Sequence, residues 1–209
     1  MALFNRKSSP ESADASVAVL DEGFDASTQA VADITGDYAI DPAHSRIGFT
    51  ARHAMVTKVR GQFEELEGTA HVDAANPADS WVKLTLKAAS ISTGQAQRDE
   101  HLKSAEFFDI ETHPEITFVS TAVEADGDDW AITGDLTISG VGKPVTVDFE
   151  QTGSAIDPYG NLRVGFEGGV TIDRTDWGLS FNAALETGGV LVSEKIKLEF
   201  DISAIRQTA

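Results

Sequence analysis

The most prominent pattern in this chain is a strict alternation of apolar and polar residues. It runs through residues 82–88, 130–138, 145–150, 162–172 and 190–202, with shorter runs at 47–51, 63–72 and 116–118. Successive side chains of a β-strand point to opposite faces, so alternation predicts strands with one dry face and one wet face. The sequence therefore predicts about eight antiparallel strands, which would form either a closed barrel or a sandwich.

Turn-forming residues separate these runs. Residues 126–128 (DGD), 140–144 (GVGKP) and 157–161 (DPYGN) predict connections between neighbouring strands. Residues 93–104 lack alternation and predict the one helical interruption. A strand over residues 190–204 could extend for 15 residues, longer than the usual 5 or 6 or so. This favours a tall barrel with a slot for a long thin ligand, although a bent strand shared by two sheets of a sandwich is the alternative.

Residues 1–35 have a different composition from the rest of the chain. Residues 1–36 are rich in Ala, Ser and Asp and contain two basic and six acidic residues, a net charge of −4. This predicts a disordered acidic leader (1–35) before a folded domain (36–209). A segment that binds a partner through Val17, Val19, Leu20 and Phe24 is the alternative.

The beginning of the chain also bears on localisation. Arg6 and Lys7 are followed by Ser, Pro and Glu rather than by the apolar stretch of a secretory signal. We therefore expect a cytoplasmic protein.

Charge and composition exclude several classes of function. The chain has 34 acidic and 16 basic residues, a net charge of −18, which predicts repulsion from nucleic acid and from anionic bilayers. It has no cysteine, so disulfides and thiolate metal sites are excluded. No apolar run approaches the roughly 20 residues of a membrane-spanning helix.

Enzyme motifs are equally scarce. The five histidines lack the close spacing of a zinc site, although folding could bring His44, His53 and His101 together. There is no G-x-S-x-G elbow, and Gly140, Gly142 and Lys143 do not have phosphate-loop spacing. We therefore expect no catalytic residue, no metal and no cofactor.

The densest polar cluster is residues 98–101 (RDEH). On a helix, Arg98 and His101 share a face. They could form local ion pairs on a solvated helix, or a polar collar at the mouth of an apolar slot beside Phe107 and Phe108. Glu194 interrupts the apolar phase of the last strand and would need a basic partner, for which Arg98 and Arg174 are candidates.

Several segments, in order, resemble the YceI-like family: residues 38–45 (YAIDPAHS), 47–53, 61–68, 90–94, 98–109 (RDEHLKSAEFFD), 113–118, 134–145 and 174–178. The resemblance covers about residues 36–205, and its most specific stretch is 98–109. It implies an all-β, extended, eight-stranded antiparallel lipocalin-like barrel that binds polyisoprenoid or related long-chain lipids in an apolar pocket. Members of this family are often periplasmic and carry signal peptides, whereas the leader of this chain has no apolar core.

The sequence thus predicts non-enzymatic carriage or storage of a long-chain isoprenoid or acyl lipid. A His-dependent lipid-modifying enzyme and an interaction module with a filled barrel are the alternatives, and a homodimer is possible. His53 falls in the inward phase of its strand. The predicted ligand-binding residues are Phe49, His53, Arg98, His101, Leu102, Phe107, Phe108, Phe118, Leu136, Phe166, Leu198 and Phe200.

Overall fold

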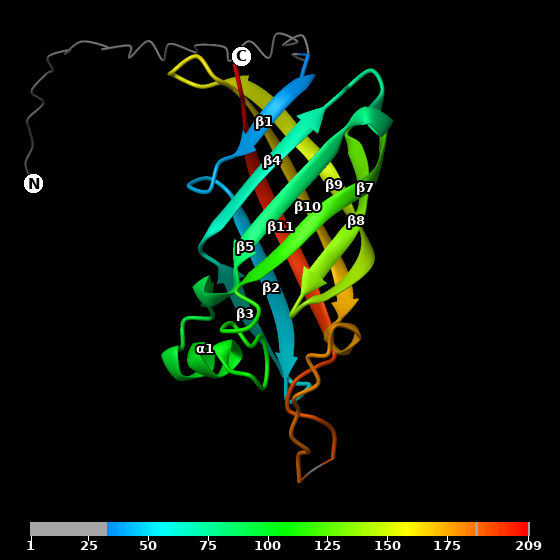
Figure 1. Ribbon diagram of the computed structural model, residues 1–209. Helices are drawn as coiled ribbons and strands as arrows, with labels where there is room; N and C mark the ends of the chain where they lie inside the picture. Colours follow the sequence, from blue (N-terminus) through cyan, green and yellow to red (C-terminus); the bar gives the residue numbers. More distant parts are fainter. Residues whose placement is uncertain (1–32, 187, 209) are drawn as a thin grey trace, which may run out of the picture. The chain divides into compact units, whose positions relative to one another are not determined.

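A computed structural model of the protein describes residues 33–186 and 188–208 (Figure 1). The strands in this part of the chain are β1 (Gly36–Ile40), β2 (Arg46–His53), β3 (Thr57–Phe63), β4 (Leu66–Val72), β5 (Trp81–Lys87), β6 (Ile91–Ser92), β7 (Glu115–Asp126), β8 (Asp129–Ile138), β9 (Val141–Ile156), β10 (Leu162–Asp173) and β11 (Lys195–Arg206). The described residues also form one α-helix, α1 (Ala96–Lys103), and the short 3-10 helices η1 (Pro77–Asp79), η2 (Ala88–Ser90) and η3 (Arg174–Trp177). None of these helices is long and apolar enough to cross a membrane.

Eight of the strands close into an antiparallel barrel. The order is β1–β4–β5–β7–β8–β9–β10–β11, and pairing of β11 with β1 closes the ring. β11 also pairs with β2, so β1 and β2 follow one another along the same edge of β11. The predicted eight-stranded antiparallel barrel is confirmed, and β2, β3 and β6 extend its sheet beyond the ring.

The alternation read from the sequence sets which side of each strand faces inward. In β8, for example, Trp130, Leu136 and Ile138 are buried while Asp135 is exposed. Register shifts in the β7–β8 and β9–β10 pairs, beside Thr121 and Thr152, mark bulges. Bulges bend strands and increase their twist, which helps a sheet to curve into a ring.

The barrel has two different ends (Figure 1). We call one the helix end: it consists of α1, the β2–β3 turn (residues 54–56) and the segment 178–193 before β11. We call the other the terminus end: it consists of the start of β1, the β9–β10 turn (157–161) and the end of β11. At the helix end, the ring of Phe108 packs edge-on against the ring of Phe63, with centroids 6.0 Å apart. The backbone carbonyl of Phe108 accepts a hydrogen bond from the hydroxyl of Ser139. The segment after α1 is thereby fixed to both β3 and the β8–β9 turn.

Several boundaries differ from the sequence prediction. β11 begins at Lys195 rather than Val190, because residues 190 and 192 form only isolated bridges. The longest strand is instead β9, with 16 residues. The turn before β9 consists of Ser139 and Gly140, both with positive φ, so Pro144 lies within the strand. The predicted helix 93–104 is shortened to α1, and the turns at 126–128 and 157–161 are confirmed.

The packing of the barrel begins inside the segment predicted as a leader. Ile34 is buried, and its carbonyl accepts a hydrogen bond of 2.6 Å from the hydroxyl of Tyr38, one of the most deeply buried side chains. The remainder of the predicted leader, residues 1–32, lies outside the described residues, as do Val17, Val19, Leu20 and Phe24.

Candidate ligand-binding cavity

A cavity of about 230 Å³ lies inside the barrel and extends between its two ends. Its wall includes Tyr38 and Trp81 toward the terminus end, and Leu179 and Val192 toward the helix end. The volume is slightly below the roughly 300–1,000 Å³ of pockets for drug-sized ligands. An apolar space that is small in volume but long suits a thin chain better than a compact polar molecule.

Glycines keep the aromatic rings close to the wall. Phe49, Phe118 and Phe149 pack directly against glycines of adjacent strands, respectively Gly61, Gly134 and Gly168, and a Cβ atom on any of these glycines would overlap the ring. A glycine within a strand often marks such a close approach. These contacts let the rings pack into the wall rather than project into the lumen.

Arg174 is the only Lys, Arg, Asp or Glu among the described residues that line the cavity. It lies in η3 and is only 4% exposed. Its Nε donates to the carbonyl of Ser193 at 3.0 Å and its Nη1 to the carbonyl of Leu179. Its Nη2 is buried and has no hydrogen-bond partner among the described residues.

The electrostatic setting of Arg174 is unusual for a buried cation. Burial lowers the pKa of Arg174, while the nearby carboxylates of Glu194 and Asp173 act to raise it. Neither carboxylate is within ion-pair distance, and a buried charge without a partner is costly. Arg174 is therefore a position in the cavity wall that is suited to bind an acceptor group of a ligand.

Nine of the residues predicted to bind ligand line the cavity. They are Phe49, Leu102, Phe107, Phe108, Phe118, Leu136, Phe166, Leu198 and Phe200. Leu136 is also buried in the main core cluster, with Phe49, Leu102 and Phe108 packed against it. The cavity wall and the hydrophobic core are therefore partly the same residues.

The three predicted polar residues, in contrast, are not in the cavity wall. His53 is exposed rather than inward, because it is the last residue of β2, beyond the part of that strand that pairs with β11. Arg98 folds back on Thr93, donating to its hydroxyl at 2.7 Å and to its carbonyl at 3.1 Å. The collar at Arg98 and His101 is therefore not formed.

His101 is part of an aromatic cluster at the helix end. Its Nε2 lies 2.6 Å from a carboxylate oxygen of Glu106, and its ring packs edge-on against Phe107 and Phe181, with centroids 5.1 and 4.8 Å apart. The cluster ties α1 to the segment 178–193. Phe181 was not identified from the sequence, because it lies outside the alternating runs.

From the sequence, Arg174 was named as a possible partner of Glu194 and as part of the family motif at residues 174–178, but not as a ligand-binding residue. The Glu194 side chain is exposed and forms no ion pair with Arg98 or Arg174 in the described part of the chain. Its backbone carbonyl accepts a hydrogen bond from the N–H of Arg174 at 2.9 Å. The signal in the sequence was that Arg174 comes two residues after Ile172 and so continues the inward phase of that strand. Whether its side chain is buried depends on the path of the chain through η3, which the sequence pattern does not give.

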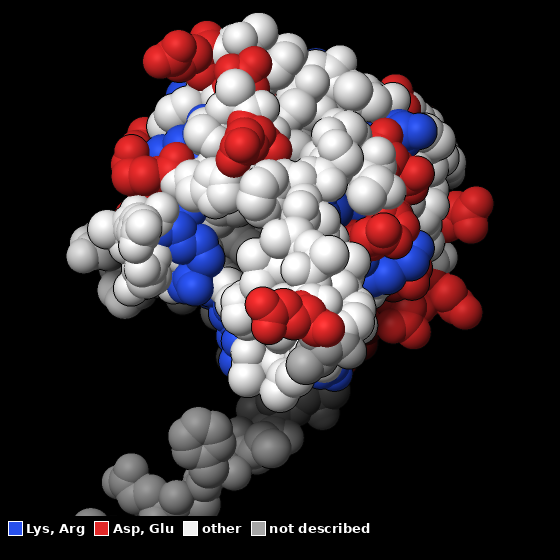
Figure 2. Space-filling view, turned by 90° about the horizontal axis from the view of Figure 1, so that it is seen from below, with Lys and Arg blue, Asp and Glu red and all other residues white. Residues whose placement is uncertain are grey.

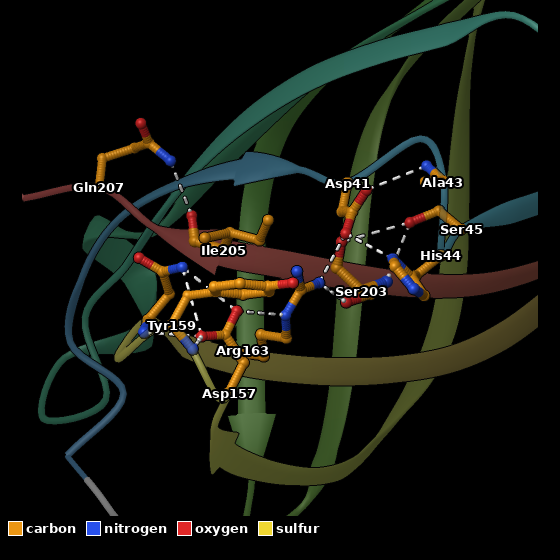
Figure 3. Close-up of polar contacts among 11 residues, drawn as sticks. Asp41, Ala43, His44, Ser45, Asp157, Tyr159, Arg163, Ser203, Ile205 and Gln207 are labelled. Atoms are coloured by element: carbon orange, nitrogen blue, oxygen red, sulfur yellow. Dashed lines mark hydrogen bonds and ion pairs between the residues drawn. The ribbon is translucent and has the colours of Figure 1, made fainter.

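The main polar network lies at the terminus end and does not line the cavity (Figure 3). A carboxylate oxygen of Asp41 lies 2.7 Å from Nδ1 of His44 and 2.6 Å from Nη1 of Arg163. Nε of Arg163 in turn donates to Asp157 at 3.0 Å. The hydrogen bond from Arg163 is the largest cause that holds the pKa of Asp41 at about 2. This network joins the β1–β2 connection to the β9–β10 turn.

No group of three or more His, Asp or Glu side chains in residues 33–186 and 188–208 is arranged to hold a metal ion. His44, His53 and His101 are not brought together: His44 contacts Asp41 at the terminus end, whereas His53 and His101 belong to the helix end.

The fold and the cavity define a class of protein: a closed antiparallel barrel with an apolar cavity in its interior. Residues 38–204 match the YceI-like domain. The chain belongs to the YceI-like family, as its motifs indicated.

Relatives and solved structures agree with this assignment. The chain is 38% identical to a UPF0312 protein of Pectobacterium atrosepticum and 37% identical to Protein YceI of Escherichia coli, each over 176 residues. The first alignment covers 83% of this chain and 88% of the relative, the second 83% and 89%. The YceI protein of Campylobacter jejuni superposes with a TM-score of 0.65 at 28% identity, covering 75% of this chain and 90% of that one. A polyisoprenoid binding domain from Saccharophagus degradans has the same fold, with a TM-score of 0.61 at 16% identity over 81% and 98% of the two chains.

Proposed function

We propose that this protein binds a long-chain lipid, such as a polyisoprenoid, inside its barrel and catalyses no reaction on it. The observation that carries the proposal is the apolar cavity, which extends between the two ends of the barrel and, among the described residues, has Arg174 as the only Lys, Arg, Asp or Glu in its wall. Membership of the YceI-like family, and the fold shared with the polyisoprenoid binding domain from Saccharophagus degradans, support a polyisoprenoid ligand.

The polar head of the ligand would bind at Arg174. Nη2 of Arg174 is a buried donor without a partner in the described residues. An acceptor group on the ligand would supply that partner, and an ionised acceptor would also compensate the buried charge. The proposed ligand therefore combines a long apolar chain with an acceptor such as a carboxylate, phosphate or phenolic oxygen.

Binding is tested by displacement titration with prenyl alcohols and fatty acids of graded length. Each methylene-sized group that enters the cavity should contribute about 0.8 kcal/mol, so affinity should rise with chain length until the cavity is full. Ala51 lines the cavity, so Ala51→Phe should shorten the longest chain that binds. Ala131→Phe is the matched control, because Ala131 lies on β8 but is not in the cavity wall.

An affinity that does not depend on chain length, and that Ala51→Phe leaves unchanged, would show that side chains fill the barrel. Native mass spectrometry of the purified protein, followed by lipid extraction, identifies the ligand directly. Turnover of a prenyl phosphate or an acyl ester, lost in His101→Ala, would replace the binding function with an enzymatic one.

A further inference from the structure

Positive charge is concentrated in one part of this acidic protein. Residues 42–63 contain four of the 16 basic residues and no Asp or Glu, although the whole chain carries 34 acidic residues. The four are Arg46, Arg52, Lys58 and Arg60. They lie on β2 and β3, which form a hairpin ending at the helix end of the barrel.

Like charges face each other on the outside of this hairpin. Arg52 pairs directly with Lys58 across the two strands, and Arg60 follows two residues later on the same face. All three side chains are exposed, and none forms an ion pair with another described residue. Because like charges directly opposite on a sheet are destabilising, this arrangement costs stability in the isolated protein.

The turn of the hairpin holds apolar side chains in solvent. Val56 is 77% exposed and Met55 is 54% exposed. The N–H of Val56 donates to the carbonyl of His53, and the two residues between them, Ala54 and Met55, have φ of 49° and 59°. Such turns normally use Asn-Gly, because a residue with a Cβ atom is disfavoured in this left-handed conformation. The turn is thus strained and yet presents its apolar residues outward.

This turn is fixed to the end of the cavity. The N–H of Ala54 donates to the carbonyl of Leu191 at 2.8 Å, and His53 pairs with Val192, which lines the cavity. Figure 2 views the helix end and shows one group of Lys and Arg side chains on its left, beside uncharged surface, while other basic side chains lie among acidic ones on the right. The cations, the exposed apolar turn and the end of the cavity therefore belong to one face.

We propose that the β2–β3 hairpin docks the protein on an anionic lipid surface. Met55 and Val56 would enter the interfacial layer, while Arg52, Lys58 and Arg60 would lie at the negatively charged head groups. Cations flanking exposed apolar side chains have the composition of interfacial membrane-binding segments. Docking would place the end of the cavity against a source of lipid, and in this respect the inference rests on the proposed function.

The net charge of −18 predicts repulsion from such a surface at long range. Exposed charges farther apart than the Debye length, about 8 Å at physiological ionic strength, are largely screened. At contact, the local charge of the hairpin therefore outweighs the charge on the distant parts of the barrel.

The first test measures co-sedimentation of the full chain with phosphatidylcholine vesicles, with and without phosphatidylserine. Each surface cation contributes about fivefold in affinity for anionic bilayers. Arg52→Gln/Lys58→Gln should thus lose roughly 25-fold, while thermal stability is kept or raised because a like-charge pair is removed. The control Lys83→Gln/Lys87→Gln changes the net charge equally on β5 and should bind like the wild type.

The second test locates the contact. The chain has no cysteine, so Met55→Cys can carry a single environment-sensitive fluorophore. Its emission should shift to the blue on vesicles with phosphatidylserine. Tyr159→Cys, at a residue 88% exposed in the turn at the terminus end, should give no shift.

Equal binding to neutral and anionic vesicles, or full binding by Arg52→Gln/Lys58→Gln, would overturn the docking proposal. Dimerisation of that variant with unchanged vesicle binding would also overturn it, since the cations would then serve to block pairing at the edge of β3. Uptake of detergent-dispersed prenyl alcohol without vesicles separates the two proposals. If the wild type takes up no prenyl alcohol, the lipid-binding proposal is contradicted and the docking proposal is not. If docking is a separate step, Arg52→Gln/Lys58→Gln should still take up the prenyl alcohol.

Discussion

Arg98 and Arg174 differ in what their guanidinium groups contact. Arg98 lies in α1 and donates hydrogen bonds to the hydroxyl and the carbonyl of Thr93, just before that helix. Arg174 is buried, bonds to two backbone carbonyls and keeps one donor free of protein partners in the described chain. Only the second arrangement leaves hydrogen-bonding capacity for a ligand.

Head-group recognition by Arg174 can be tested through the ratio of two affinities. The wild type should bind palmitic acid more tightly than palmityl alcohol, roughly tenfold or more, since hydrogen bonds to charged groups contribute about 1.5–3 kcal/mol. Arg174→Met should reduce this ratio toward one.

Arg174→Met will also lower stability, because the bonds to Ser193 and Leu179 are lost. For this reason the ratio of the two affinities is the readout, and not either affinity alone. An acid-to-alcohol ratio that is the same in both proteins would mean that the head group binds elsewhere.

The Asp41 network predicts a dependence of stability on pH. The pKa of Asp41 is lowered from 3.8 to about 2, first by Arg163 and also by His44. A group whose pKa is depressed by folding stabilises the folded state above its unfolded pKa, and this contribution is lost as the pH falls from about 4 to about 2. Asp41→Asn should therefore lower the free energy of unfolding by roughly 1–2 kcal/mol at neutral pH.

Urea unfolding of the wild type and of Asp41→Asn, repeated between pH 7 and pH 2, measures this contribution. The difference between the two proteins should shrink across the acidic window. A difference that stays constant down to pH 2 would show that the carboxylate charge of Asp41 is not what stabilises the connection.

The strands are paired so that aromatic rings lie against glycines. Phe149 and Gly168 are direct register partners on β9 and β10, and Phe49 and Gly61 are partners on β2 and β3. A strand glycine normally weakens a sheet, but here it provides room for a large side chain. The pairing of strands thus decides how far each ring projects into the cavity.

Gly168→Ala is expected to destabilise the barrel by about 1–3 kcal/mol, because the added Cβ would meet both the Phe149 ring and the backbone carbonyl of Asp148. Gly142→Ala is the control, since its Cβ would meet only the Thr137 hydroxyl at an ordinary 3.4 Å. Thermal unfolding of the two variants gives the comparison. Equal melting temperatures would indicate that the β9–β10 pair relaxes without cost.

At the scale of the whole molecule, the barrel begins before its first strand. Ile34 belongs to a core cluster with Tyr38, Val72 and Val164, and Arg206 near the other end of the chain donates to the carbonyls of Asp33 and Thr35. These contacts join both ends of the described domain.

Two truncations distinguish the leader from the barrel. Deleting residues 1–30 should leave the melting temperature nearly unchanged, because that segment is too polar to bury much apolar surface. Deleting residues 1–34 should lower it by several degrees, since burial of an Ile side chain contributes about 1.5–3 kcal/mol. A large loss of stability on deleting 1–30 would instead assign the leader a structural role.

The sequence by itself determined the barrel, its inward faces and most of its apolar wall. Side-chain direction in a strand alternates with a period of two, so residues such as Leu136 and Phe166 could be assigned to the interior without knowing which strands are neighbours. The alternation also indicated about eight strands but left a barrel and a sandwich open, and the family motifs then implied the barrel and a lipid ligand.

The tertiary structure alone decided which polar side chains lie where. Arg98 and His101 were expected at the cavity because they are close in sequence to Phe107 and Phe108, but a helix presents its residues to several sides and these two found local partners. Arg174 lines the cavity because it lies in η3, directly after β10, and its side chain is buried there. The opposition of Arg52 and Lys58 likewise arises from the strand register, which a one-residue slip would have changed.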